Sequence, residues 1–404
     1  SYFYRSVTNS IPCVNTTWGD PMSGLRKSCD YSTQTTTTPP PTTTPPPTTT
    51  PPPPTTTYNL YVSAAIGKDT NPGTSPTAPL RTIQRAASLS KPSTTVHVAP
   101  GTYAETITSS ISGTATGRIR YVSDQKQKAI ITRAGTGGNT MWNVIGGYID
   151  IDGFALDGTG GTTTRIGISM RGGNSSVQNT LVHDVALNSG CDNQGGAGMV
   201  TNQYDGTNRN NYDFIGNVVH HVGNGCGWIQ GIYHSSSGRI INNVVYATSQ
   251  GINMGHDDHN ILVMNNTVFN NAGYGIRFGG CTEAYNNGCP TSGIQIHNNI
   301  IYGNSGGIQG PIATEDKGNS VSNNLVYANG TDYSLASTGS ANQTKTGMIA
   351  ANPQFVNYIA NGGGDYRLKS TSPAIGKGQT ANAPAYDING KARGAAIDMG
   401  AYEY

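Results

Sequence analysis

The sequence predicts an all-β protein built as a right-handed parallel β-helix, a solenoid of stacked β-coils. Three observations favour this fold: a short asparagine phrase recurs six times, its spacings are 38, 26, 23, 33 and 25 residues, and 54 of the 404 residues are glycine. A repeat near that length, rich in glycine and β-branched residues, indicates stacked β-coils, because one coil cannot bury its apolar face alone. The right hand follows the general preference of parallel crossovers.

Each copy of the phrase is an asparagine, two apolar or β-branched residues and usually an aromatic residue. Coils stack about 4.8 Å apart, so like residues are expected to form columns. The asparagines are predicted to form a ladder at a turn, where their amides bond backbone groups that the bend leaves unpaired. The ladder is Asn179, Asn217, Asn243, Asn266, Asn299 and Asn324. The aliphatic column is Leu181, Val219, Val245, Val268, Ile301 and Val326, and the nearly aromatic column is His220, Tyr246, Phe269, Tyr302 and Tyr327.

A second phrase, Gly-Ile, marks the next strand of three successive coils, at residues 231, 251 and 275. Aligning these phrases predicts that Tyr233, Asn253 and Arg277 stack in one column with outward side chains. An aromatic platform, an amide and a guanidinium suit a sugar that carries a carboxylate. The sequence therefore predicts a carbohydrate-binding face, with a solvated face of no function as the alternative.

Composition indicates a protein that works outside the cell. Charged residues make up 11% of the chain and the net charge is +2, so no basic stripe exists to neutralise nucleic-acid phosphates. No apolar run approaches the roughly 20 residues that span a bilayer. The chain begins at Ser1 rather than at methionine, as expected either after removal of a signal peptide or for a chain trimmed in another way. Its six cysteines are predicted to form disulfides, pairing Cys13 with Cys29, Cys191 with Cys226, and Cys281 with Cys289.

Three parts follow one another along the chain. Residues 1–34 form a short tail, too small for a core of its own. Residues 35–57 contain only threonine and proline, which favours an extended polyproline II linker with O-glycosylation, or an unmodified stiff spacer. Residues 58–404 form the β-helix domain. The threonines expected to carry glycans are Thr36, Thr37, Thr42, Thr43, Thr44, Thr48, Thr49, Thr50, Thr55 and Thr56.

Both ends of the β-helix domain carry segments expected to close it. An amphipathic pattern at Leu80, Ile83, Ala86, Ala87 and Leu89 predicts a helix that caps the first coil. Such a cap would protect strand edges that otherwise template aggregation. The segment from residue 372 to residue 403 is expected to close the opposite end.

The opening of this domain resembles that of secreted pectate-lyase-like β-helix proteins, an opening shared with polysaccharide lyase family nine. The resemblance rests on residues 61–63, 67–74, 82–84 and 96–103. The last residues, 398–404, are similar to the ending of many bacterial secreted β-helix proteins. The likeness implies a right-handed β-helix over about residues 58–404. It carries little about activity, because these phrases are structural.

Family nine implies a lysine base beside a calcium ion held by aspartates, but this chain has no lysine between Lys128 and Lys317. The family's catalytic set therefore has no counterpart here. Arg277 is the best placed alternative base. The densest polar cluster, His256-Asp257-Asp258-His259, lies between strands, so Asp257 or His256 is a candidate base, and Asp257 with Asp258 a candidate calcium site. The alternative is that these aspartates cap the turn. Of eight histidines, seven lie between His183 and His297, and His220 is expected to pack in the aromatic column.

Two classes of function fit these features, and a third is weaker. The first is a secreted structural protein, a glycosylated fibre subunit whose tail docks on its neighbour by strand addition. The second is a polysaccharide lyase, or another carbohydrate-active enzyme, acting on an acidic polysaccharide. The third makes residues 1–34 a small carbohydrate-binding or anchoring module. The sequence ranks the fibre subunit slightly above the enzyme and names no certain cofactor.

Overall fold

A computed structural model describes residues 57–133, 139–159, 164–192, 194–201, 210–256, 258–279, 291–310, 318–335 and 344–404. The stretch from Thr55 to Tyr404 is one compact unit. Predictions for the tail, the threonine glycans and Asp257 fall outside the described residues, as do those for Cys13, Cys29, Cys281 and Cys289. Within the described part, no helix is long and apolar enough to cross a membrane.

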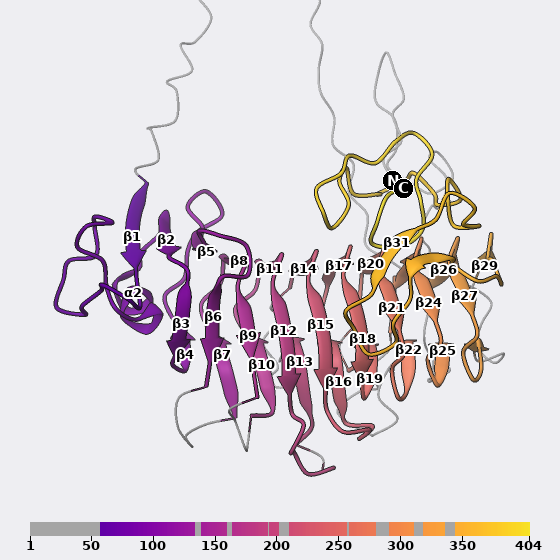
Figure 1. Cartoon of the computed structure of the whole chain (residues 1–404), viewed down its shortest axis with the longest axis horizontal. Coiled ribbons are helices and arrows are strands. Elements are labelled where there is room, and N and C mark those ends of the chain that lie inside the picture. Colours follow the sequence, from indigo (N-terminus) through magenta and orange to yellow (C-terminus); the bar gives the residue numbers. More distant parts are fainter. Residues whose placement is uncertain are drawn as a thin grey trace, which may run out of the picture. The chain divides into compact units, whose positions relative to one another are not determined.

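Three long sheets form the body of the unit (Figure 1). Sheet A contains β1(Tyr58–Val62), β2(Thr94–Val98), β5(Ile119–Ser123), β8(Ile149–Asp152), β11(Ser175–Gln178), β14(Tyr212–Ile215), β17(Gly238–Ile241), β20(Ile261–Met264), β23(Gln295–His297), β26(Ser320–Ser322) and β29(Thr344–Thr346). Sheet B contains β3(Gly101–Ala104), β6(Ala129–Thr132), β9(Ala155–Asp157), β12(Leu181–Val185), β15(Val218–Val222), β18(Val244–Thr248), β21(Thr267–Phe269), β24(Ile300–Tyr302) and β27(Leu325–Tyr327). Sheet C contains β4(Ile107–Ser109), β7(Thr140–Val144), β10(Ile166–Met170), β13(Gly196–Thr201), β16(Ile229–His234), β19(Gln250–Met254), β22(Tyr274–Arg277), β25(Gly306–Gln309) and β28(Tyr333–Ser334).

The chain visits sheets A, B and C in turn and then repeats. Strands of successive coils are neighbours in each sheet, and their pairing is parallel, as between β15, β18 and β21. This is the predicted right-handed parallel β-helix, so the fold class is confirmed.

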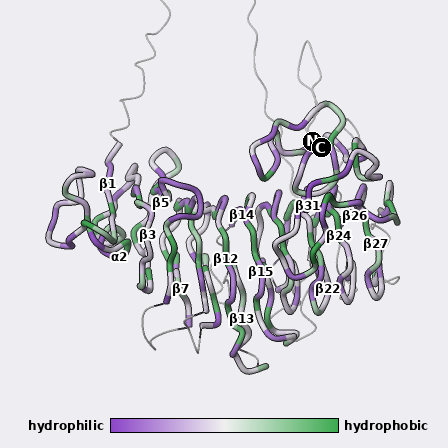
Figure 2. The backbone as a smooth tube through the Cα atoms, in the orientation of Figure 1, coloured by the Kyte–Doolittle hydropathy of each residue, from purple (hydrophilic) through white to green (hydrophobic). Residues whose placement is uncertain are grey.

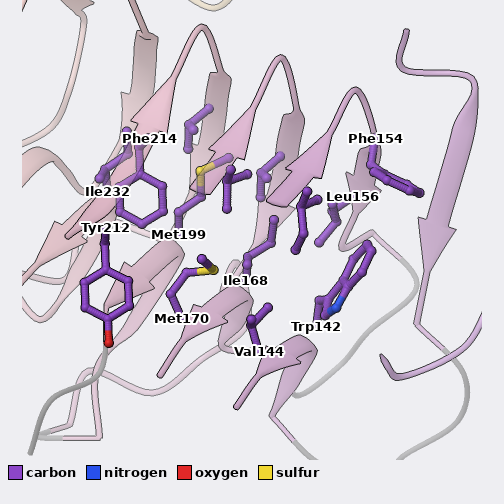
Figure 3. Close-up of a cluster of buried hydrophobic side chains, with 14 of the residues drawn as sticks. Trp142, Val144, Phe154, Leu156, Ile168, Met170, Met199, Tyr212, Phe214 and Ile232 are labelled. Carbon is purple, nitrogen blue, oxygen red and sulfur yellow. The ribbon is translucent and has the colours of Figure 1, made fainter. Parts of the chain in front are cut away.

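Side chains from all three sheets fill the interior of the coils. Hydrophobic residues recur along the strands from coil to coil (Figure 2). Near the first coils, the buried rings of Tyr121, Trp142 and Phe154 meet edge to face at 5.3 and 5.2 Å between centroids. Trp142 also donates from Nε1 to Ser109 Oγ at 3.1 Å, which satisfies its one polar atom inside the core. Figure 3 shows Trp142 and Phe154 in the same cluster as Met199, from a coil further along.

The predicted capping helix is present as α2(Ile83–Leu89) and buries Ile83, Ala86 and Ala87 against the first coil. Its first turn is held by the carboxylate of Glu105, which accepts from the backbone nitrogens of Ile83 and Gln84 at 2.9 and 2.8 Å. A negative charge at a helix N-terminus is favourable, and here it also ties the helix to the coil that it covers.

An asparagine ladder runs along the turn between sheets A and B, as predicted. From Asn243 onward, each ladder side chain accepts through Oδ1 from the backbone nitrogen and the amide of the previous asparagine, as between Asn243 and Asn266 at 2.9 Å. Assigning Asn179 to this ladder was wrong by one position. Asn179 has a left-handed backbone with φ 51°, and Thr180 instead donates to the next ladder residue, Asn217.

The same shift corrects the aliphatic column, where Val182 rather than Leu181 pairs with Val219. The physical reason is that the turn has two positions, a left-handed residue followed by the ladder residue. Both are asparagine in later coils, such as Asn242 and Asn243. A single asparagine therefore does not reveal which of the two positions it occupies.

The aromatic column on the outer face of sheet B is confirmed. His220, Tyr246 and Phe269 are aligned in register, and their rings stack at 4.9 Å between successive centroids. This apolar outer face is covered by residues 355–404, which we call the C-terminal segment. Phe355 and Tyr366 join Tyr246 and Phe269 in a buried cluster that is separate from the interior of the coils.

The C-terminal segment therefore packs along the flank of the coils, contrary to the expectation that residues 372–403 close the far end. It includes the antiparallel pair β30(Phe355–Asn357) and β31(Asp365–Leu368). In Figure 1 this yellow segment lies over the coils of β18 to β27. The physical reason is that the aromatic row on sheet B would otherwise expose a large apolar surface to water, and apolar side chains of the segment cover it.

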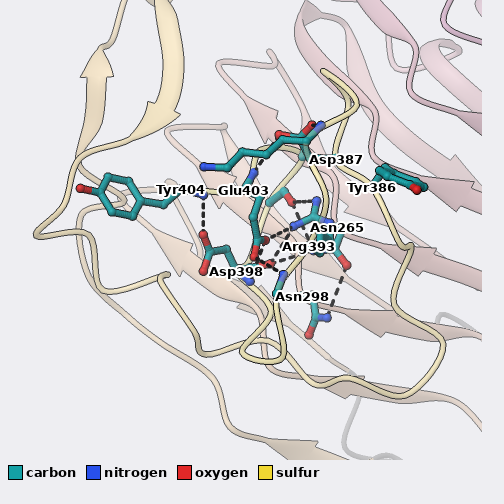
Figure 4. Close-up of polar contacts among 12 residues, drawn as sticks. Asn265, Asn298, Tyr386, Asp387, Arg393, Asp398, Glu403 and Tyr404 are labelled. Carbon is teal, nitrogen blue, oxygen red and sulfur yellow. Dashed lines mark hydrogen bonds and ion pairs between the residues drawn. The ribbon is translucent and has the colours of Figure 1, made fainter.

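A buried arginine fastens this segment to the asparagine turns. The side chain of Arg393 is fully buried and donates to Glu403 Oε2 at 2.8 Å. It also donates to Asn242 Oδ1 and to the carbonyl of Gly400, both at 2.9 Å. Figure 4 shows Arg393 among the polar contacts around Glu403 and Asp398. Burial lowers the pKa of Arg393, and the adjacent Glu403 carboxylate opposes that shift. The ion pair is thus the centre of the contact between segment and coils.

Candidate functional site

The outer face of sheet C carries a row of residues across neighbouring coils that is polar at every position except Val200. Register places Tyr233 opposite Asn253, Asn253 opposite Arg277, and Arg277 opposite Gln309. The predicted stacking of Tyr233, Asn253 and Arg277 in one column is therefore present. We call the whole row the sheet C column: Thr108, Asn143, Ser169, Val200, Tyr233, Asn253, Arg277, Gln309 and Ser334.

Strand alternation explains why this column faces outward. In β19, Ile252 and Met254 are buried in the core, so Asn253 between them points to the opposite face. In β22, Ile276 lies in the core and Arg277 follows it, before the buried Phe278. The apolar residues on both sides thus hold the guanidinium in a defined place on the sheet.

Arg277 is the only charged member of the sheet C column. Its side chain is half-buried, and its Nε is buried with no hydrogen-bond partner among the described residues. An unpaired polar atom in a buried position costs about 1–3 kcal/mol. A carboxylate is the ligand that would best match a guanidinium in that setting, because the pair bonds through two parallel hydrogen bonds.

Three other members of the column share this feature. Asn143 Oδ1, Ser169 Oγ and Gln309 Oε1 are also buried without a partner in the described part of the chain. Buried polar atoms are normally hydrogen-bonded, and exceptions call for an explanation. They lie with Arg277 along one row of one sheet, so four buried polar atoms of this row lack a partner among the described residues.

His256 lies next to the sheet C column, at the end of β19. Its backbone is left-handed, with φ 62°, and its ring meets that of Tyr233 edge to face at 6.2 Å between centroids. The structure thus brings His256 together with Tyr233, one member of the sheet C column. Asp257, between His256 and Asp258, lies outside the described residues.

Asp258 takes a different position from its neighbours. Its side chain is fully buried, and its Oδ1 accepts from Thr291 Oγ1 at 2.6 Å. This contact joins two successive turns after sheet C strands, which is the role of a turn-capping carboxylate. A calcium site at Asp257 and Asp258 stays a prediction.

The predicted disulfide between Cys191 and Cys226 is present, with an S–S distance of 2.06 Å. The two cysteines precede β13 and β16, so the bond joins adjacent coils at the side where the chain enters sheet C. Nearby, Arg165 makes a two-point ion pair with Asp192, at 2.8 and 2.9 Å. The entry side of the sheet C column is therefore cross-linked in this region.

Sequence reasoning missed several members of this face. The Gly-Ile phrase also occurs, in part, as Gly167-Ile168, Gly198-Met199 and Gly307-Ile308, and following it would have placed Ser169, Val200 and Gln309 in the column. Trp228 was also missed. It directly precedes β16 and is 55% exposed, which is unusual for tryptophan and provides an aromatic surface at the edge of sheet C.

His234 lies next to Tyr233 but on the inner face of β16, and its burial predicts that the stability of the protein depends on pH. It is buried against Tyr212 and Phe214, and burial lowers its pKa to about 4. Between pH 6.5 and pH 4 the unfolded chain binds the proton that the folded chain excludes, so stability falls as pH falls through this window. At pH 4 we expect protonation of His234 in the unfolded chain to lower the free energy of unfolding by about 3 kcal/mol relative to neutral pH.

Thermal unfolding of wild type and His234→Gln across this pH range checks the prediction. Glutamine keeps an N–H donor for the carbonyl of Tyr212, which His234 Nε2 contacts at 3.1 Å, but does not titrate. The variant should lose part of the acid sensitivity. An unchanged pH profile in His234→Gln would contradict the assignment.

Fold and site together define the class: a parallel β-helix with a largely polar row of residues on the outer face of one sheet. Among solved structures the chain is similar to that of pectate lyase Pel9A, with a TM-score of 0.59 and 18% identity, covering 86% of this chain and 97% of that chain. It is also similar to XylC in complex with xylose (TM-score 0.49, 12% identity, 72% and 70% coverage) and to a rhamnogalacturonan lyase (0.46, 13%, 75% and 91%).

At such identities the likeness to Pel9A shows the fold alone, and the two matches with TM-scores below 0.5 carry no argument. No family model and no curated protein matches the chain. What the site does must therefore be argued from its own residues.

Proposed function

We propose that the protein is a carbohydrate-active β-helix protein that binds an acidic polysaccharide along the sheet C column. The observation that carries this proposal is the half-buried Arg277, whose Nε lacks a partner among the described residues. It lies in the same row as three more polar atoms that lack one there, on Asn143, Ser169 and Gln309. Successive sugars of a chain laid across the coils would meet successive members of the column. Arg277 would bind a uronate carboxylate, while Tyr233 and Trp228 offer aromatic surfaces to sugar rings.

The reaction that this arrangement supports best is β-elimination. A base removes the proton from C5 of a uronate, the bond between C4 and the bridging oxygen breaks, a C4–C5 double bond forms, and the leaving oxygen takes up a proton. Arg277 would stabilise the negative charge that develops on the carboxylate. His256, one coil away and beside Tyr233, is the described candidate for the base, since imidazole accepts protons near neutral pH.

The fold of a pectate lyase and the polar face favour this function over the fibre subunit that the sequence ranks first. Assembly through residues 1–34 stays a prediction, because those residues lie outside the described part of the chain. The same holds for O-glycosylation of residues 35–57 and for calcium. The disulfide between Cys191 and Cys226 supports an extracellular location, where such bonds persist.

Binding and elimination are tested separately on the full chain. Affinity electrophoresis in gels with polygalacturonate or alginate measures binding, with neutral dextran as the control, and ultraviolet absorbance of the unsaturated uronate product measures elimination. We expect retardation by an acidic polymer and a rise in absorbance. Retardation without a rise would reject the lyase and retain a binding protein. No retardation by either acidic polymer would overturn the proposal.

A further inference from the structure

A second polar cluster lies on sheet B, away from the sheet C column. Asp157 of β9 and His183 of β12 are paired in register and belong to the outward row that continues with His220 and Tyr246. Asp184 follows His183 with a left-handed backbone, φ 57°, which interrupts strand alternation. Its carboxylate consequently lies beside His183 rather than on the opposite face, with Nδ1 and Oδ2 at 2.6 Å.

The three side chains provide a set of ligand atoms of the right size for one metal ion. His183 Nδ1 lies 3.9 Å from Asp157 Oδ1, and the ligand atoms of all three residues lie within 4.8 Å of one another. Zinc bound at about 2.0–2.2 Å from each ligand holds neighbouring ligand atoms about 3.3 Å apart. The distance between His183 Nδ1 and Asp184 Oδ2 would lengthen by less than about 1 Å. The distance between His183 Nδ1 and Asp157 Oδ1 would shorten by a similar amount.

The surroundings hold these ligands in place. The ring of His183 stacks on that of His220 at 5.1 Å, with 17° between their planes. The carboxylate of Asp157 accepts from the backbone nitrogen and the hydroxyl of Thr159, at 2.9 and 2.6 Å.

An ion can reach the cluster from solvent. The C-terminal segment buries the row at Tyr246 and Phe269, whereas the side chains of Asp157, His183 and Asp184 remain 27%, 20% and 25% exposed. Partial burial is suited to metal binding, because it leaves an entry path and still limits competition by water.

We propose that Asp157, His183 and Asp184 bind one divalent transition-metal ion, with zinc the best match. One imidazole and two carboxylates suit zinc, whereas calcium takes six to eight oxygen ligands. The ion takes the place of the proton between His183 Nδ1 and Asp184 Oδ2, and links β9 to β12 across two coils. The site is independent of the sheet C column, and its role is to stabilise the coils that the C-terminal segment leaves bare.

Titration calorimetry on the full chain, stripped of metal with a chelator and titrated with zinc chloride, tests the proposal. We expect one ion per chain, and weaker binding by more than roughly tenfold in Asp157→Asn and in Asp184→Asn. These amides keep the size of the side chains, and circular dichroism confirms folding. Cobalt as a probe should give visible absorption bands in the wild type that both variants weaken.

A matched control is available on sheet A. His97 Nδ1 and Asp124 Oδ1 form a similar pair at 3.1 Å, also partly exposed, so Asp124→Asn should leave zinc binding unchanged. Absence of stoichiometric zinc binding would overturn the proposal. Binding in Asp157→Asn and Asp184→Asn as tight as in the wild type would place the ion elsewhere and would also overturn it.

Discussion

Replacement of Arg277 by methionine is expected to lower kcat/KM on an acidic polysaccharide by at least about a hundredfold, the loss typical of removing one group that stabilises developing charge. Methionine keeps an unbranched side chain between the buried Ile276 and Phe278, so the strand should fold as before. It removes the only charge in the sheet C column. The measurement is the initial rate of unsaturated product formation, together with gel retardation.

The control for Arg277→Met is Arg239→Met. Arg239 lies on β17 of sheet A, where it forms an ion pair with Asp213 at 2.6 Å, away from the sheet C column. It should keep wild-type binding and activity. Arg277→Lys keeps a charge but loses the two parallel hydrogen bonds of a guanidinium. Its binding and activity should therefore lie between those of Arg277→Met and Arg239→Met. Wild-type binding and rate in Arg277→Met, with thermal unfolding unchanged, would remove Arg277 from the site.

Replacement of Arg393 by methionine is expected to reduce the free energy of unfolding by about 4 kcal/mol, the cost of leaving a buried partner charge uncompensated. The change leaves Glu403 buried without its ion pair and removes the bond to Asn242 on the coils. The C-terminal segment should then release first and expose Tyr246 and Phe269. Chemical denaturation measures the loss, and limited proteolysis followed by mass spectrometry locates the first cleavage.

The control for Arg393→Met lies in the same segment. Arg367 also forms an ion pair, with Asp365 at 2.5 Å, but its side chain is 61% exposed. Exposed pairs are screened by water and contribute little. Arg367→Met should therefore unfold like the wild type and resist protease equally. Equal sensitivity of the two variants would show that burial of the Arg393 pair does not hold the segment.

Much of the candidate site could be predicted from the sequence, because parallel stacking of the coils places equivalent residues of a repeated phrase next to one another. The Gly-Ile phrase placed Tyr233, Asn253 and Arg277 together correctly. What the phrase did not show is which polar atoms lack partners. Burial of Arg277 Nε and Gln309 Oε1 depends on how neighbouring coils pack, and a one-dimensional pattern does not contain that.

The register error at Asn179 has the same origin. The turn between sheets A and B has a left-handed position and a ladder position, and asparagine suits both. Only the hydrogen bond from Thr180 to Asn217 shows which residue occupies which position. Local chemistry thus predicted the kind of turn, and contact between coils decided its alignment.

The sequence by itself determined the parallel β-helix, its capping helix α2, its stacked columns and the disulfide between Cys191 and Cys226. These follow from periodicity, because each coil repeats the contacts of the previous one. Tertiary structure alone decided that the C-terminal segment covers part of the outer face of sheet B. It alone also decided that Asp157, His183 and Asp184 come together on strands of the same sheet. Both depend on contacts between residues distant in sequence or on a left-handed strand residue, and neither leaves a periodic signal.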